Sequence, residues 1–313
     1  MAKLTMTQEG SSPSTPGSDK WIIYPKAGGW YSKDDNGNEY EITPSSFQPG
    51  GRLTLTTAVP VTTSDVTGAT NVFYTPYVSD KIALWNGAFW QPTIFTEKTL
   101  ALGTVTSGLP YDVFGYLASG TLALEKLAWT NGTTRATGIS IQDGRYCKTG
   151  DKTRLYLGTF YTTSTTQTED SNAKRFLYNF YNRRLRKMIV REATASWTYS
   201  TSTYRSLNNN TANRIQIVNG VAEDLIDIDV MVVALSTAIN PRYAGIGVNS
   251  TSTNTWDILI RSAGIEYSLA HTKLKHYPAV GFTFYQALEY GSGTGTQTWH
   301  GADEAGIGAD WMC

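Results

Sequence analysis

Carboxylates in the C-terminal half are the side chains of this 313-residue sequence that are best placed for catalysis. Asp227 and Asp229 alternate with apolar residues, so they share one face of an expected strand, about 6–7 Å apart from the rise per residue. Paired carboxylates at such separations can cleave glycosidic bonds. Glu289 is a further candidate acid in this half. A strand with one solvated face shows the same alternation, and we favour that interpretation over catalysis.

The other patterns that could indicate a metal, phosphate or catalytic site match their motifs poorly. The three histidines, His271, His276 and His300, lack the spacing of a helical zinc motif and have no cysteines nearby. The run 34–39 has its glycine at the fourth position, whereas a calcium loop needs it at the sixth. The glycine-rich run 291–295 lacks the lysine of a phosphate loop, and no serine sits in a nucleophile elbow. We therefore predict a protein that is not an enzyme, with no metal site and no cofactor.

The elements that carry these residues are expected to be strands. Aromatic residues make up 12% of the chain and charged residues only 17%, and threonine, valine, isoleucine and tyrosine all favour pleated strands. Five dipeptides are typical of two-residue type I′ turns between paired strands: Asn36-Gly37, Asn86-Gly87, Asn131-Gly132, Asp143-Gly144 and Asn219-Gly220. Ile226, Ile228, Val230 and Val232 line one face of a single strand. The pattern predicts an all-β fold of antiparallel sandwich or jelly-roll-like domains.

The chain divides into an arm and two β-rich regions. Residues 1–20 are polar and contain two prolines, and residues 21–43 form a small hairpin unit that is too short to be stable alone. We predict three parts: a docking arm and hairpin at 1–50, a β-rich domain at 51–180, and a C-terminal sandwich-like domain at 181–313. A single continuous domain after residue 51 is the alternative.

Charge and hydropathy exclude several partners. The sequence has 26 basic and 26 acidic residues, so it lacks the positive surplus that nucleic-acid binding needs. No apolar run is long enough to cross a membrane, and the first residues lack the apolar stretch of a secretion signal. Cys147 and Cys313 are therefore expected to be unpaired thiols in a protein made in a reducing compartment. We predict no nucleic acid as partner and no membrane insertion.

One basic stretch and one aromatic group leave alternatives open. The segment 174–191 mixes Lys and Arg with Phe and Tyr, which suits a single-strand nucleic-acid groove, an anionic-sugar patch, a subunit interface or a solvated strand. We favour the last two because the net charge is zero. Three aromatic residues late in the chain are candidates for contact with a glycan or a subunit interface: Trp256, Tyr285 and Trp299. We favour packing in the core or between subunits over contact with a glycan.

The N-terminal segment resembles the virion-attachment leader of tailed-phage fibres and related appendage proteins. The arm 9–16 has the pattern S-x-P-x-T-P, a strand carries Lys20, Tyr24 and Lys26, and the run 31–39 reads Y-x-K-D-D-x-G-x-E. Asp19 departs from the pattern, which has a small residue at that position. Stretches at 109–114, 127–131, 154–160 and 175–183 also resemble phage structural proteins that carry this leader.

The resemblance implies a virion component, made in the host cytoplasm and assembled as a homotrimer. Its N-terminus would dock on other virion proteins of the tail or capsid, and its β domains would project outward, where they could contact host-surface glycans. We expect a tail fibre or short appendage; a capsid decoration protein and a polysaccharide-cleaving tail enzyme are the alternatives. The residues expected to dock are Pro13, Pro16, Trp21, Ile23, Tyr24, Trp30, Tyr31, Asp34 and Asp35. A stretch this small cannot bury its aromatic rings by itself, so we expect these rings to pack against another polypeptide.

Overall fold

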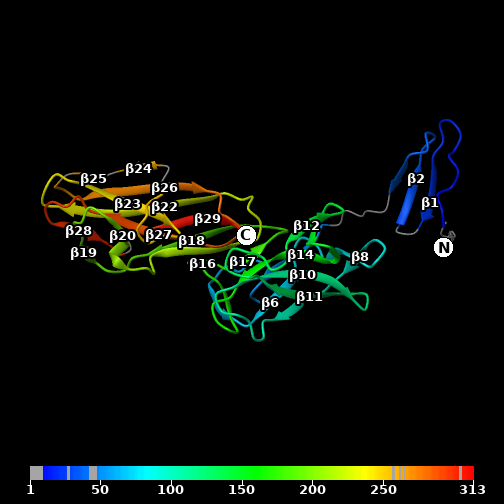
Figure 1. The fold of residues 1–313 in the computed structure, drawn as a ribbon, viewed down its shortest axis with the longest axis horizontal. Helices are drawn as coiled ribbons and strands as arrows, with labels where there is room; N and C mark the ends of the chain where they lie inside the picture. The colour runs from blue at the N-terminus through cyan, green and yellow to red at the C-terminus, as the bar shows by residue number, and fades with distance from the viewer. Residues whose placement is uncertain are drawn as a thin grey trace.

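The computed structural model describes residues 10–26, 29–41, 48–255, 258–260, 262–263, 265–302 and 305–313 (Figure 1). These residues form antiparallel strands, with one parallel pair between β16 (Lys174–Arg175) and β21 (Arg214–Asn219). Within that described part, the single helical segment is a 3₁₀ turn at Leu207–Asn209. The all-β fold is confirmed. No helix of the described residues is long and apolar enough to cross a membrane.

The first unit is a three-stranded sheet. Its strands are β1 (Ile22–Lys26), β2 (Gly29–Lys33) and β3 (Glu39–Glu41), in that order. The predicted strands at 21–24, 30–33 and 39–42 coincide with these elements within two residues. Figure 1 shows this sheet as a separate unit in blue.

The second unit contains three sheets around one core. Its largest sheet has the order β11-β10-β14-β13-β12, with β17 paired to β14; a three-stranded sheet has the order β4-β6-β9; and β7 pairs with β8. The bounds are β4 (Gly51–Thr54), β6 (Asn71–Pro76), β7 (Lys81–Trp85), β8 (Trp90–Ile94), β9 (Lys98–Ala101), β10 (Pro110–Ala118), β11 (Thr121–Ala128), β12 (Ile139–Gln142), β13 (Arg145–Lys148), β14 (Asp151–Tyr161) and β17 (Leu177–Asn179).

The third unit is a sandwich of two sheets. One has the order β18-β29-β22-β26-β24, with β28 on β22 and β19 on β28: β18 (Leu185–Arg191), β19 (Ser196–Thr198), β22 (Ile226–Ser236), β24 (Ile258–Ile260), β26 (Ser268–His276), β28 (Gln297–His300) and β29 (Gly306–Met312). The other has the order β25-β23-β27-β21-β16-β15-β5, with β20 on β27: β5 (Val66–Ala69), β15 (Thr168–Asp170), β20 (Tyr204–Ser206), β23 (Pro241–Val248), β25 (Ser262–Ala263) and β27 (Gly281–Tyr290).

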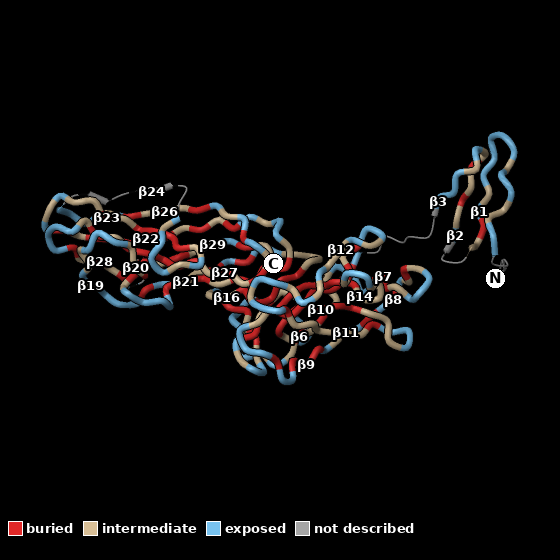
Figure 2. The backbone as a smooth tube through the Cα atoms, in the orientation of Figure 1, coloured by how far each residue is buried: buried red, intermediate tan, exposed pale blue. Residues whose placement is uncertain are grey.

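Alternation along β22 shows why this sandwich forms. Four side chains are fully buried, as their spacing predicted: Ile226, Ile228, Val230 and Val232. They belong to one hydrophobic core with Ile215 of the opposite sheet. The buried apolar residues fall into two clusters, one ending at Leu177 and the other beginning at Tyr178. Figure 2 shows these two buried regions in red. One sheet nevertheless includes strands from both sides of this point, so the division at 180/181 stays a prediction.

Most of the predicted two-residue turns are wrong. Asp143-Gly144 is such a turn: Gln142 pairs with Arg145, and both turn residues have positive φ, 51° and 76°. The loop at Asn86-Gly87 has four residues, since Trp85 pairs with Trp90. The steps at Asn36-Gly37 and Asn131-Gly132 lie in longer loops, between Lys33 and Glu39 and between Trp129 and Arg135.

Asn219-Gly220 joins no hairpin at all, because β21 pairs with β16 and β27 but not with β22. Gly220 is instead a point of close approach to Tyr156 of β14 and to Tyr178. A Cβ atom there would lie 2.1 Å from the Tyr156 hydroxyl and 2.6 Å from the Tyr178 ring. The Gly220 carbonyl also accepts a hydrogen bond of 2.8 Å from Arg135, whose guanidinium binds the buried Asp112 carboxylate with bonds of 2.7 and 3.1 Å.

Candidate functional site

One face of the N-terminal sheet carries exposed apolar side chains. Trp21 precedes β1, Ile23 lies within it, Trp30 is on β2 and Tyr40 is on β3; Ile23 and Tyr40 both pair with Ser32, which places them on the same face. Their exposed fractions are 61%, 57%, 43% and 46% in that order. The rings of Trp21 and Tyr40 stack with centroids 5.5 Å apart. We call these four residues the aromatic face.

The opposite face of the same sheet is covered by the arm. Tyr24 is only 3% exposed, its ring stacks on Tyr31, and its hydroxyl lies 3.3 Å from the Ser12 hydroxyl. Lys33 donates hydrogen bonds to Ser12 and to the Pro13 carbonyl. The described part of the arm therefore packs on the sheet of its own chain. This corrects the expectation that the whole segment depends on another polypeptide, which now applies to the aromatic face alone.

The turn between β2 and β3 is organised by Asp34. Its carboxylate accepts backbone hydrogen bonds from Asn36 and Asn38, side-chain bonds from Asn38 and Tyr40, and is 6% exposed. The hydrogen bond from the Asn38 side chain is the main reason that the pKa of Asp34 lies below its usual value. Asp34 therefore acts within the turn and presents little surface to a partner, so its prediction as a docking residue is not supported by its burial.

The remaining docking candidates also have roles inside the unit. Asp35 accepts a hydrogen bond of 2.9 Å from the backbone of Asp19. Asp19 has a φ of 60°, in the left-handed region that favours glycine. Pro13 and Pro16 are half-buried in the arm. Tyr40 was missed; the signal was its alternation with Glu39 and Glu41, which puts it on the side opposite to those acids.

The late aromatic residues lie in the core. Tyr285 and Trp299 are both 0% exposed, which puts them out of reach of a glycan and agrees with the core packing that we favoured from the sequence. Each has an internal hydrogen bond: the Trp299 indole donates to the Tyr199 carbonyl at 2.8 Å, and the Tyr285 hydroxyl lies 2.9 Å from Nδ1 of His276. The two sheets of the sandwich bury the rings because each covers the inner face of the other. Trp256 lies outside the described residues.

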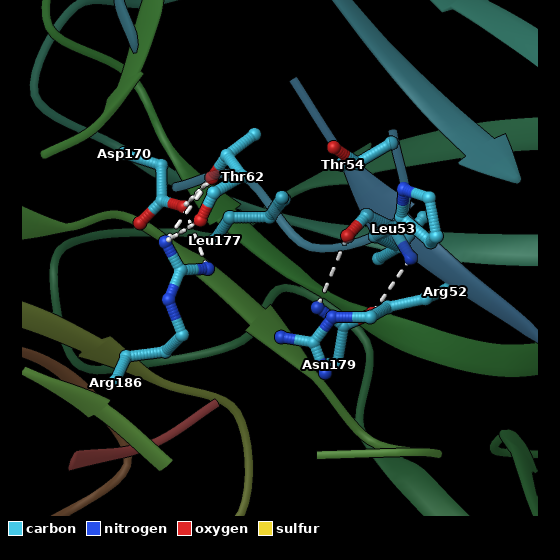
Figure 3. Close-up of a pocket in the computed structure, with 9 residues that line it drawn as sticks. Arg52, Leu53, Thr54, Thr62, Asp170, Leu177, Asn179 and Arg186 are labelled. Atoms are coloured by element: carbon cyan, nitrogen blue, oxygen red, sulfur yellow. Dashed lines mark hydrogen bonds and ion pairs between the residues drawn. The ribbon is translucent and has the colours of Figure 1, made fainter. Parts of the chain in front are cut away.

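The basic stretch is largely used inside the protein. Asp170, 3% exposed, binds Arg175 at 3.1 Å and Arg186 at 3.3 Å, and Arg186 also donates to Thr62. Figure 3 shows Asp170, Arg186 and Thr62 in the same pocket as Arg52. The space among the lining side chains has no room for a water molecule. The cluster is therefore a set of buried ion pairs that joins β15 and β16 of one sheet of the sandwich to β18 of the other, and it offers no entry to a ligand.

The candidate catalytic acids do not form a site. Asp227 and Asp229 share the outer face of β22, where Lys275 lies 4.0 Å from Asp227, and Lys273 and His271 lie 3.3 and 2.6 Å from Asp229. Their cross-strand partners give the solvated-face pattern that we favoured from the sequence.

Glu289 lies on the other sheet and is fully buried. Its two oxygens accept bonds from the Trp197 indole at 2.6 Å and from Arg205 at 2.8 Å. Burial raises the pKa of Glu289 to about 7. A raised carboxyl pKa is typical of general acids, but here both oxygens are occupied and none of its surface is open.

Metal and thiol chemistry receive no support from the geometry. Within the described ranges, no three His, Cys, Asp or Glu side chains gather as a metal site would require. Cys147 and Cys313 are buried free thiols. Burial raises the pKa of Cys147 to about 12 and that of Cys313 to about 11, so neither is a reactive thiolate.

An open cleft of about 520 Å³ was not predicted from the sequence. The β12–β13 hairpin provides Ile141 and Tyr146, and the segment after β17 provides Phe180, Tyr181 and Arg183. Tyr146 packs edge-to-face on Phe180, with centroids 5.0 Å apart, and Phe180 packs the same way on Tyr181 at 4.8 Å. We call this the aromatic cleft. Tyr146 and Phe180 are 34 positions apart in the sequence, and no local pattern brings the two segments together.

Comparisons with known proteins add little. No protein-family model and no curated protein match this chain. Among solved structures, BuGH86 in complex with neoagarooctaose aligns with a TM-score of 0.24 and 10% identity, covering 80% of this chain and 34% of that one. The insecticidal delta-endotoxin Cry8Ea1 from Bacillus thuringiensis aligns with a TM-score of 0.24 and 8% identity, covering 96% and 60%. The chain spans about a third of the first protein and three fifths of the second, and similarity this low carries no argument about function.

Proposed function

We propose that this chain is a non-enzymatic structural protein that attaches to a larger assembly through its N-terminal arm and sheet. The aromatic face carries the proposal: four neighbouring apolar side chains remain between 43% and 61% exposed on a sheet of three short strands. Aromatic residues grouped on a surface are typical of the centre of a protein interface. A sheet of this size is marginal alone and gains stability when its open face is covered.

The resemblance of the leader to phage fibres supports a virion as the assembly, in which the chain acts as a homotrimeric tail fibre or short appendage. A capsid decoration role uses the same docking surface. The arrangement of the acids supports a structural role over a polysaccharide-cleaving one, because Asp227 and Asp229 are paired with basic side chains and Glu289 is buried.

The test removes the aromatic face while leaving the fold of the sheet unchanged. Trp21→Ser combined with Ile23→Thr should abolish co-sedimentation of the tagged protein with assembled virus particles, because both side chains are more than half exposed. The matched control combines Ile239→Thr with Tyr277→Ser, which removes two side chains that are 78% and 67% exposed elsewhere. Equal incorporation of both double variants would overturn the docking role.

A further inference from the structure

The aromatic cleft has the properties of a small-molecule site. Its volume of about 520 Å³ lies within the range of roughly 300–1,000 Å³ that is usual for ligand pockets. Tyr146, Phe180 and Tyr181 are each half-buried, so part of every ring contacts neighbours and part remains accessible. Because successive rings are nearly perpendicular, at 79° and 82°, the cleft presents both ring faces and ring edges to a ligand.

The wall of the cleft is held rigidly. Asn182 adopts a left-handed conformation with a φ of 56°. Its side-chain amide donates to the Pro49 carbonyl at 2.8 Å and to the Gly51 carbonyl at 2.9 Å, and its own carbonyl accepts a bond from Arg52. These bonds fix the backbone between Tyr181 and Arg183. A ligand would therefore meet a surface that is already in place, which lowers the entropic cost of binding.

The charges around the cleft cancel. Arg183 forms ion pairs with both Glu223 and Asp224. Among the residues that line the cleft, Arg183 and Glu223 are the charged ones, and they neutralise each other. A charged ligand would have to displace one of these pairings, whereas a neutral ligand with hydroxyl groups can share the polar atoms at the rim.

We propose that the aromatic cleft binds a neutral saccharide, with a sugar ring packed on the Tyr146–Phe180–Tyr181 rings and its hydroxyls hydrogen-bonded to the Arg183–Glu223 pair. A saccharide combines apolar C–H faces with hydroxyls at its edge and carries no charge, which matches the aromatic wall, the polar rim and the balanced charge. Burial holds the pKa of Tyr181 well above its usual value, so its hydroxyl stays protonated. This site is separate from the aromatic face of the docking sheet.

A proline-rich peptide is the other class of ligand that aromatic grooves accept. The arm of this chain contains Pro13 and Pro16 at a suitable spacing. In the structure, however, the Pro13 carbonyl is bound by Lys33 and the neighbouring Ser12 bonds to Glu39, so the arm is already engaged by its own sheet. This favours the saccharide.

The experiment exposes labelled full-length protein to a printed array of neutral and anionic oligosaccharides, followed by calorimetric titration of the strongest ligand. Tyr146→Ala should weaken binding about tenfold, because a ring contact is lost. The control Tyr277→Ala, which removes a 67% exposed ring elsewhere, should leave the affinity unchanged. Glu223→Ala removes an exposed rim carboxylate without touching the core, and should weaken binding about fivefold.

Three results would overturn the proposal. They are an array without signal, signal confined to anionic glycans and weakened by salt, and equal binding by wild type and both cleft variants. Binding of a synthetic peptide of residues 10–18 in place of any glycan would assign the cleft to the proline-rich class. Both cleft variants should still join particles normally, so failure here leaves the docking role standing, and failure of docking leaves the cleft standing.

Discussion

The N-terminal sheet and the C-terminal sandwich use the same kinds of side chain with opposite results. The N-terminal sheet is antiparallel, the sandwich is antiparallel except for the β16–β21 pair, and both contain large aromatic side chains. In the sandwich, Trp299 and Tyr285 are completely buried, whereas in the N-terminal sheet Trp21 is 61% exposed. The difference lies in the second layer, because each sheet of the sandwich covers the other, while the arm covers only one face of the small sheet.

This contrast separates apolar residues that hold the fold from those that are free to bind. Burial of a ring in the sandwich stabilises the chain itself, since apolar surface is removed from water on folding. Exposure of a ring on the aromatic face leaves the same free energy to be gained when another molecule covers it. The two regions should therefore respond differently to equivalent substitutions.

The largest expected difference is between Trp299→Ala and Trp21→Ala. We call the second and third units together the body. Loss of the buried ring should lower the free energy of unfolding of the body by about 3–5 kcal/mol, since it leaves a cavity and deprives the Tyr199 carbonyl of its hydrogen-bond donor. Loss of the exposed ring should change that free energy by less than about 0.5 kcal/mol. Urea denaturation of both variants, followed by circular dichroism, measures the difference.

A body that is destabilised as much by Trp21→Ala as by Trp299→Ala would show that the N-terminal sheet packs on the rest of the chain. The contrast would then be broken, and the aromatic face would be part of the fold. The matched control is Ile239→Ala, which removes a side chain of the body that is 78% exposed. Like Trp21→Ala, it should leave the free energy of unfolding almost unchanged.

The same contrast explains what the sequence could predict. Period-two alternation correctly identified the buried face of β22, because a residue and its second neighbour lie on the same face of a strand. Aromatic and β-branched runs between turn residues correctly identified the three strands of the N-terminal sheet. It could not tell that Trp299 is covered and Trp21 is not, since that depends on which sheets meet. The arm's return onto Tyr24 was missed for the same reason.

The turns and the cleft show two further limits. A glycine after asparagine or aspartate signals a positive φ or a close approach, and only the fold decides between them. Asp143-Gly144 is a turn, whereas Gly220 packs closely against Tyr156 and Tyr178. The aromatic cleft needs the β12–β13 hairpin to meet the segment after β17. The ion pairs that neutralise it, from Arg183 to Glu223 and Asp224, span 40 residues or more, so the basic stretch gave no sign of how its charge is used.

A second difference concerns pH. Burial raises the pKa of Glu289 in the sandwich to about 7 from 4.5, so the folded body holds this proton more tightly than the unfolded chain does. Its contribution to stability is complete below pH 4.5 and is lost as the pH rises to about 7, a decrease of about 3 kcal/mol. In the N-terminal sheet, the hydrogen bond from Lys26 lowers the pKa of Glu39, and the sign is reversed: its contribution is present at neutral pH and is lost on acidification.

Urea titrations of wild type and Glu289→Gln at pH 5 and pH 8 measure the larger of these effects. In the wild type, the stabilising contribution of Glu289 should be larger at pH 5 than at pH 8. The free energy of unfolding of the variant should therefore fall less between these two pH values, because glutamine does not titrate. Glu39→Gln serves as the control, since its group lies in the other region. An identical pH slope for wild type and Glu289→Gln would contradict a raised pKa at this position.

The smallest expected effect compares one substitution at two glycines. Gly37 in the N-terminal sheet and Gly144 in the β12–β13 hairpin have φ values of 84° and 76°, so alanine at either position costs about 1 kcal/mol. At Gly37 a Cβ atom would also lie 3.2 Å from the Thr15 hydroxyl of the arm, whereas at Gly144 it would meet nothing within 4 Å.

The body should remain folded after Gly144→Ala, because about 1 kcal/mol is a small part of the free energy of unfolding of a large folded unit. A three-stranded sheet has far less to lose, so Gly37→Ala should strongly speed hydrogen exchange at the β1–β3 amides and leave the unfolding midpoint of the body unchanged. Gly144→Ala should lower that midpoint slightly and leave the β1–β3 amides protected as before. If Gly37→Ala left exchange at β1–β3 unaltered, the small sheet would be stable in its own right, and its open face could no longer be explained by a need for cover.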